Sequence, residues 1–214
     1  MTIEENVRIY AGQVIRDQEG FEKWDYSDDF KSDVFILWEI CKRNPKEWNK
    51  FCSCLSEEIN ATIGHSFVLD RMTAGTTWKS LAARIDHSIL KRLNNVEIIR
   101  NLRIGSDGIH FDFKDEQIKR CLLKCGQVLE LYITFIAKAL TDRIGKPVYN
   151  DVQCGVLLDW DNPDINNDKY NSYTTTNEID IMLMKGIVPV FVSCKNGVTD
   201  IGELYKLNTV AERF

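Results

Sequence analysis

Hydrophobic residues recur at helical spacing through the first third of the chain. Apolar positions after Ser32, and again after Asn44-Pro45-Lys46-Glu47, return every three or four residues, which predicts two helices. Three residues signal the start of the second helix: Asn44 can cap it, Pro45 suits its first position, and Glu47 stands at its third. A third helical pattern runs from Thr77 to Leu93. We therefore expect the N-terminal part to be mainly helical.

A β-hairpin is predicted after these helices. The turn-forming residues Gly105-Ser106-Asp107-Gly108 come before a strict alternation of apolar and polar residues over 109–113. Helices followed by a two-stranded ribbon suggest a winged-helix-like module, which we place at residues 1–114. The preceding helix is only mildly basic, so a structural or dimer-forming wing is favoured over a DNA-reading one, although both stay open.

The pattern changes in residues 115–214. Asp115 can cap a helix to about Lys124, and a second, almost wholly apolar helix runs from Gln127 to Arg143. Glu130 is a carboxylate within that apolar stretch. Three extended segments and a last helix follow, over 152–159, 178–184, 187–195 and from 200. The order of helices and strands predicts an α+β fold with two domains, 1–114 and 115–214.

The last two extended segments predict a hairpin with polar groups at one end. If Lys185-Gly186 forms the turn, opposed residues have numbers that sum to 371, so that Glu178 faces Ser193 and Asp180 faces Phe191. Because side chains alternate between the faces of a strand, one end of one face collects the polar residues. These are Glu178, Asp180, Ser193 and Lys195.

Two carboxylates beside a lysine on a buried sheet are typical of a metal-dependent hydrolase. Crowded carboxylates repel each other unless they share a cation. A divalent metal activates water and polarises a phosphoryl oxygen, and a lysine can assist that water or neutralise developing charge. The alternative is a surface salt-bridge ladder of Glu178, Asp180 and Lys195, which the continuous apolar runs of the same strands disfavour.

The order of helix, three strands and helix, with an acid on the second strand and a lysine ending the third, resembles the PD-(D/E)xK nuclease superfamily. More narrowly, three motifs are similar to the nuclease end of CARF-fused nucleases from type III CRISPR systems. These motifs are Gly126-x-x-Leu129-Glu130, Asn177-Glu178-Ile179-Asp180 and Ser193-Cys194-Lys195-Asn196-Gly197. The resemblance implies a restriction-endonuclease-like core that follows the winged-helix-like module.

The resemblance also implies roles for single residues. Asp180 would bind the metal, Mn²⁺ or Mg²⁺, together with Glu130 and the carbonyl of Cys194, and Lys195 would be the catalytic lysine. The superfamily's second acid falls at Ser193, a poorer ligand, so Glu178 or, less directly, Glu203 would supply that charge. Alternatively, the site is weakened or inactive.

The implied substrate is single-stranded DNA or RNA, and the implied state is a homodimer. Members of the family are switched by cyclic oligoadenylate through a CARF domain, and no segment of that size precedes the winged-helix-like module here. A fourth core strand would also be expected after the last helix. We therefore expect an excised C-terminal part of a longer protein, or a stand-alone relative. The competing class is a binding module that uses an inactive nuclease fold to dimerise or to dock nucleic acid.

Composition fits an ordinary globular protein. The 214 residues are 44% hydrophobic and 28% charged. The net charge of −5 excludes a protein that binds nucleic acid through an overall positive charge. An acidic stretch at Asp159, Asp161, Asp164 and Asp168 is either a solvated loop or part of a metal site. The seven cysteines do not have the spacing of a disulfide framework, so we expect them to serve as small hydrophobic residues of the core. No apolar run is long enough for a membrane helix, and no signal peptide is evident, so we expect a cytoplasmic protein.

Overall fold

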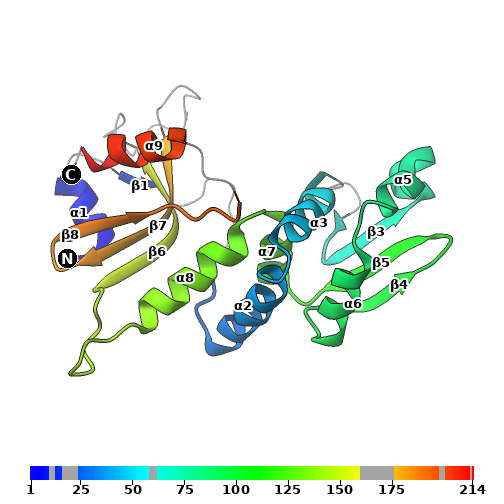
Figure 1. The fold of residues 1–214 in the computed structure, drawn as a ribbon, viewed down its shortest axis with the longest axis horizontal. Coiled ribbons are helices and arrows are strands. Elements are labelled where there is room, and N and C mark those ends of the chain that lie inside the picture. Colours follow the sequence, from blue (N-terminus) through cyan, green and yellow to red (C-terminus); the bar gives the residue numbers. More distant parts are fainter. Residues whose placement is uncertain (10–12, 16–23, 58–61, 160–175, 198–200, 213) are drawn as a thin grey trace. The chain divides into compact units, whose positions relative to one another are not determined.

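The chain forms two units of helices and antiparallel sheet. The structure, a computed structural model, describes residues 1–9, 13–15, 24–57, 62–159, 176–197, 201–212 and 214. Unit 1 comprises Met1–Lys23 and Ile133–Phe214, and unit 2 comprises Trp24–Tyr132. Each unit has one four-stranded sheet among its described residues (Figure 1), which confirms the α+β class. The predicted domains, 1–114 and 115–214, stay a prediction.

Unit 2 contains most of the helices that the sequence predicts. Its helices are α2 (Asp28–Cys41), α3 (Pro45–Glu57), α4 (Arg71–Ala74), the 3₁₀ helix η2 (Gly75–Thr77), α5 (Trp78–Ala82), α6 (His87–Asn95), α7 (Glu116–Leu123) and the first half of α8 (Gln127–Ala139). Its strands are β2 (Thr62–Ile63), β3 (Ser66–Asp70), β4 (Ile99–Ile104) and β5 (Gly108–Phe113), in the order β2-β3-β5-β4. The short strands β2 and β3 were not predicted.

Capping side chains fix the ends of several helices in unit 2. The Asn44 side chain accepts from the Glu47 N–H at 3.4 Å, and Asp115 accepts from the Ile118 N–H at 2.8 Å, as predicted. The single helix expected over 77–93 is wrong, because the Asp86 carboxylate caps the first turn of a new helix, α6. A strong cap therefore outweighs a continuous apolar stripe here.

The predicted hairpin is present as β4 and β5. Ile104 pairs with Ile109, and the Gly105 N–H donates to the Gly108 carbonyl at 2.9 Å across the turn. The alternating apolar residues of β5 are buried, and Phe111 stacks on Phe67 of β3 with ring centroids 5.0 Å apart. The sheet therefore packs one face into the core of unit 2.

Unit 1 is built around the second sheet. Its elements are α1 (Ile3–Ile9), β1 (Gln13–Ile15), the second half of α8, β6 (Asp151–Asp159), β7 (Thr176–Lys185), β8 (Val188–Val192) and α9 (Ile201–Ala211). The strand order is β1-β6-β7-β8, and every neighbouring pair is antiparallel (Figure 1). A fourth strand was expected after the last helix. The structure instead has β1, from the N-terminal part of the chain, in the fourth position.

Helices α1 and α9 share a buried core with this sheet. Their side chains join those of β6 and β7 in one cluster, made of Ile3, Val7, Val156, Leu158, Ile179, Met182, Met184 and Val210. The consecutive residues Ile181 to Met184 of β7 are all buried. Strand β7 is therefore covered on both faces, as its continuous apolar run predicts.

The apolar helix α8 is shorter than predicted. It ends at Ala139 instead of Arg143, because the chain turns back on itself after it. The Val148 N–H donates to the Leu140 carbonyl at 2.9 Å, and Thr141 forms a β-bridge with Pro147. These bonds take backbone groups that would otherwise continue the helix.

The β7–β8 hairpin is shifted from the predicted register. Lys185 pairs with Val188, so opposed residues sum to 373 and the turn is Gly186-Ile187, not Lys185-Gly186. Gly186 has a φ of +67°, which glycine adopts easily, and its N–H donates to Asn150 Oδ1 at 2.6 Å. Because the sum changes by two, every side chain keeps its predicted face, but the predicted pairing of Glu178 with Ser193 is wrong.

Candidate active site

Three consecutive residues after β8 converge on one carboxylate oxygen of Asp180. Asp180 Oδ2 accepts from the Cys194 backbone N–H at 2.6 Å and from Ser193 Oγ at 3.1 Å. Lys195 Nζ lies 3.7 Å from the same oxygen. The observed register places Ser193 across from Asp180, one position beyond the last strand pair, Ile181 with Val192. The corrected hairpin therefore assembles Asp180, Ser193 and Lys195.

These contacts fix the Asp180 carboxylate and leave its second oxygen available. In the described part of the chain, every hydrogen bond and ion pair of Asp180 is made by Oδ2. The Asp180 side chain is 17% exposed, and the Lys195 side chain is 34% exposed. A short bond from a backbone N–H orients a carboxylate strongly. Asp180 Oδ1 thus belongs to a fixed, partly buried carboxylate that can bind a cation.

Gly155 lies across from Asp180 on the neighbouring strand. The pairs Cys154–Ile181 and Val156–Ile179 flank this position. Gly155 has a φ of +64°, and an added Cβ would meet nothing within 4 Å. The position next to Asp180 on the neighbouring strand therefore has no side chain, and the space that one would occupy is open. The alternation of side chains along the strand does not point to this residue, although an isolated glycine within an extended segment signals such an irregularity.

Glu178 lies on the same strand as Asp180. It lies across from Leu157 of β6, two residues before Asp180, and is exposed. Its role as a second carboxylate stays a prediction. The alternative acid, Glu203, lies on α9, and its side chain is outside the described residues, as are Asp161, Asp164 and Asp168.

Glu130 is a buried carboxylate on α8. It is only 6% exposed, and its Oε2 accepts from Gln127 Nε2 at 3.0 Å within the same helix turn. Gln127 is also buried, so the pair is shielded from water. Glu130 belongs to unit 2, whereas Asp180 belongs to unit 1. That both bind one metal ion stays a prediction.

The described donors fit one side of a divalent-metal site. Asp180 offers a fixed carboxylate with an available oxygen, and a carboxylate is a preferred ligand of Mg²⁺ and Mn²⁺. Among the described residues, however, no group of three or more His, Cys, Asp or Glu side chains is placed to hold a metal ion. A complete site would need donors in addition to this cluster.

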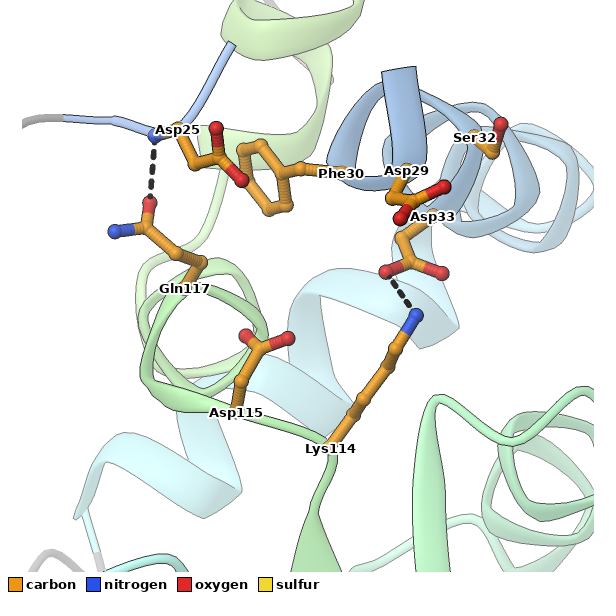
Figure 2. A pocket seen from close by; sticks show the side chains of 8 residues that line it. All are labelled: Asp25, Asp29, Phe30, Ser32, Asp33, Lys114, Asp115 and Gln117. Atoms are coloured by element: carbon orange, nitrogen blue, oxygen red, sulfur yellow. Dashed lines mark hydrogen bonds and ion pairs between the residues drawn. The ribbon is translucent and has the colours of Figure 1, made fainter. Parts of the chain in front are cut away.

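A separate pocket in unit 2 is acidic but structural. It has a volume of about 370 Å³ and is lined by Asp25, Asp29, Phe30, Ser32, Asp33, Lys114, Asp115 and Gln117 (Figure 2). Asp33 pairs with Lys114 at 2.5 Å, and Asp115 caps α7. Hydrogen bonds from Ser27 lower the pKa of Asp25. These carboxylates therefore already serve the local fold.

No protein-family model and no curated protein match the sequence. Within the described residues, none of the helices has the length and apolar content needed to cross a membrane. The solved structures that are similar in fold include the following two. Protein VC1899 from Vibrio cholerae matches with a TM-score of 0.61 and 16% identity, over 100% of this chain and 49% of that one. Can2 from Sulfobacillus thermosulfidooxidans, in complex with cyclic tetra-adenylate, matches with a TM-score of 0.55 and 12% identity, over 100% of this chain and 48% of that one.

The chain spans about half the length of both similar structures. At these identities the likeness concerns the fold alone. The α+β fold of this chain is thus of the kind found in Can2.

Proposed function

We propose that the chain is the nuclease part of a CRISPR-linked protein related to cyclic oligoadenylate signalling. It would hydrolyse phosphodiester bonds of single-stranded DNA or RNA. The observation that carries the proposal is the convergence of Ser193, Cys194 and Lys195 on Asp180, in a fold shared with Can2 along the whole chain. The winged-helix-like and PD-(D/E)xK assignments of the two parts belong to this proposal.

Each residue of the cluster has a chemical role in the proposed reaction. Asp180 and the Cys194 carbonyl, together with Glu130, would hold Mn²⁺ or Mg²⁺. The bound metal would supply Lewis acidity and lower the pKa of a coordinated water. The Cys194 N–H orients the Asp180 carboxylate, and Ser193 Oγ supports the same oxygen. The ammonium group of Lys195, kept near Asp180 by their ion pair, would neutralise charge that develops on the phosphate.

The partners follow from the same proposal. A second copy of the chain would form the homodimer, and cyclic oligoadenylate would act through a CARF domain rather than through the residues of this cluster. The location that the proposal requires is the cytoplasm.

A cleavage assay with matched lysine variants tests the proposal. Labelled single-stranded DNA and RNA are incubated with Mn²⁺, with Mg²⁺ or with a chelator. We expect metal-dependent cleavage that falls at least about 100-fold in Lys195→Ala, the usual scale for loss of one charge-stabilising group. Lys185→Ala, an exposed lysine at the other end of β7, is the control and should cleave normally. Equal cleavage by both variants would remove Lys195 from the reaction.

A second function is favoured by two observations. By the proposed resemblance, Ser193 takes the position of the superfamily's second acid, and among the described residues no group of three or more candidate ligands is placed to hold a metal ion. Both fit a module that binds nucleic acid or dimerises without cleaving. In a gel-shift assay with Mn²⁺, such a module would retain the labelled strand intact, whereas the nuclease would convert it to shorter products.

A further inference from the structure

One cysteine of unit 2 departs from the role of a core hydrophobe. Cys41, Cys52, Cys54 and Cys121 are buried, but Cys125 is exposed, in the turn between α7 and α8. Its Sγ lies 3.3 Å from the Asn49 carbonyl oxygen and 3.3 Å from Ser53 Oγ. Both groups belong to α3. The Cys125 sulfur therefore rests on α3 at the positions directly around Cys52.

Cys52 lies on α3 between Asn49 and Ser53, the two residues that the Cys125 sulfur contacts. Cys52 is fully buried on α3, and the interaction between its thiol and that of Cys125 shifts the pKa of both groups. This interaction, together with the hydrogen bond to Ser53, lowers the pKa of Cys125 to about 6, against the opposing effect of burial. The same interaction and burial raise the pKa of Cys52. Of these two thiols, Cys125 is thus the one that loses its proton more easily and that solvent reaches.

We propose that Cys125 is an oxidation site, and that Cys52 is the thiol that resolves the oxidised form into a disulfide. Two independent features of the geometry support this assignment. Cys125 is exposed and so open to a small oxidant such as hydrogen peroxide, and its sulfur contacts Asn49 and Ser53, the residues of α3 on either side of Cys52. An accessible thiolate next to a resolving cysteine is the usual arrangement of a redox-sensitive cysteine.

The proposed reaction has two balanced steps. The Cys125 thiolate attacks one oxygen of hydrogen peroxide, the O–O bond breaks, and hydroxide leaves, which takes up a proton to become water. The resulting Cys125 sulfenic acid is then attacked by the Cys52 sulfur, which loses its proton, and the S–O bond breaks to release a second water. In total, two thiols are oxidised to one disulfide and one peroxide is reduced to two waters. The disulfide would join α3 to the turn before α8.

The reactivity of Cys125 can be measured by alkylation at several pH values. Iodoacetamide labelling, followed at each cysteine by peptide mass spectrometry, should change only about 1.1-fold for Cys125 between pH 7 and pH 9. A thiol of ordinary pKa, near 8.5, should instead label about 25-fold faster over the same interval, because its thiolate fraction rises by that factor. The half-buried Cys154 of unit 1 is an internal comparator. An ordinary pH dependence at Cys125 would overturn the proposal.

Peptide mapping after peroxide treatment tests the resolving partner. Trypsin places Cys125 at the start of the peptide 125–138, separate from Cys121, and places Cys52 with Cys54 in the peptide 51–71. We expect a peroxide-dependent link between these two peptides, which persists in Cys54→Ala and is lost in Cys52→Ala and Cys125→Ser. In Cys52→Ala, dimedone should trap the sulfenic acid at Cys125.

The outcomes of the mapping are distinct. A link from Cys125 to Cys41 or Cys121 would overturn the assignment of Cys52. Cys125 that stays reduced while Cys154 is oxidised would overturn the site itself. The same peptide analysis is made on Cys54→Ala, so that a general loss of packing on α3 is recognised by labelling of all the buried cysteines.

Discussion

Replacing Ser193 by aspartate tests whether the cluster around Asp180 is built to hold a cation. Ser193 Oγ lies 3.1 Å from Asp180 Oδ2, so a carboxylate at position 193 would stand roughly 3–4 Å from that of Asp180. Two like charges at 4 Å repel by about 1 kcal/mol in water and about 4 kcal/mol at an effective dielectric constant of 20. The Asp180 side chain is 17% exposed, so water screens part of this repulsion. In the absence of metal, we therefore expect Ser193→Asp to lower the free energy of unfolding by about 1–3 kcal/mol.

A divalent ion should reverse this effect. An ion between the two carboxylates turns their repulsion into shared attraction, and the new aspartate would supply the second acid that the proposed PD-(D/E)xK assignment calls for. Stabilisation by a bound ligand reaches about 2.7 kcal/mol when its concentration is 100 times the dissociation constant. Ser193→Asp should therefore melt below the wild type in a chelator, and should gain more in melting temperature from Mn²⁺ than the wild type does.

Thermal melting followed by tryptophan fluorescence, with and without Mn²⁺, measures both effects. Ser193→Asn is the matched control, because it has nearly the same size as aspartate without the charge. The reasoning would be refuted if Ser193→Asp and Ser193→Asn melted at the same temperatures in the chelator and responded equally to Mn²⁺. Mn²⁺ titration by calorimetry should show tighter binding to Ser193→Asp than to the wild type or to Ser193→Asn.

Three further changes have defined outcomes. Gly155→Ala forces a left-handed backbone on an alanine and should cost about 1–2 kcal/mol in a melting experiment, whereas Gly197→Ala, whose added Cβ meets nothing and whose φ is not left-handed, should be nearly neutral. Asp86→Ala removes the cap of α6 and should lower stability by about 1 kcal/mol, with Asp86→Asn recovering most of it. Hydrogen bonds from Asn101 and Ser66 lower the pKa of Asp112 in the folded protein. The ionised Asp112 therefore stabilises the fold above the pKa of the unfolded chain, about 3.9, and this stabilisation is lost as the pH falls through the lower pKa of the folded protein. The melting temperature of Asp112→Asn should therefore fall less steeply than that of the wild type on acidification below about pH 4.

Periodicity predicted the long elements well because their apolar residues have one dominant environment. The β4–β5 hairpin and β7 follow from alternation or from a continuous apolar run, and the caps Asn44 and Asp115 act as predicted. The helix expected over 77–93 was wrong, because a continuous stripe carries no information about a competing cap within it. Short strands such as β1 were missed, since three residues contain too little pattern.

The candidate site was predicted more closely than the register that builds it. Asp180 and Lys195 were expected on one face, and their ion pair at 3.7 Å confirms that they lie together. The turn was placed one residue early, because its position depends on Asn150, which is 36 residues from Gly186 in sequence and holds the Gly186 N–H. A shift of two in the pairing kept the faces but exchanged the partner of Ser193 from Glu178 to Asp180. Local pattern sets the face of a strand, whereas a distant contact sets its register.

The location of Mn²⁺ in crystals of the wild-type chain tests the central claim most directly. An anomalous difference map recorded at the manganese edge should show an ion bound to Asp180 Oδ1, at about 2.0–2.3 Å, the range for carboxylate oxygens on such metals. Crystals of Asp180→Asn, soaked in the same way, should show none there. The account would be contradicted by an ion bound elsewhere, with Asp180 keeping only its contacts to Ser193, Cys194 and Lys195. The cluster would then serve only to stabilise the β7–β8 hairpin.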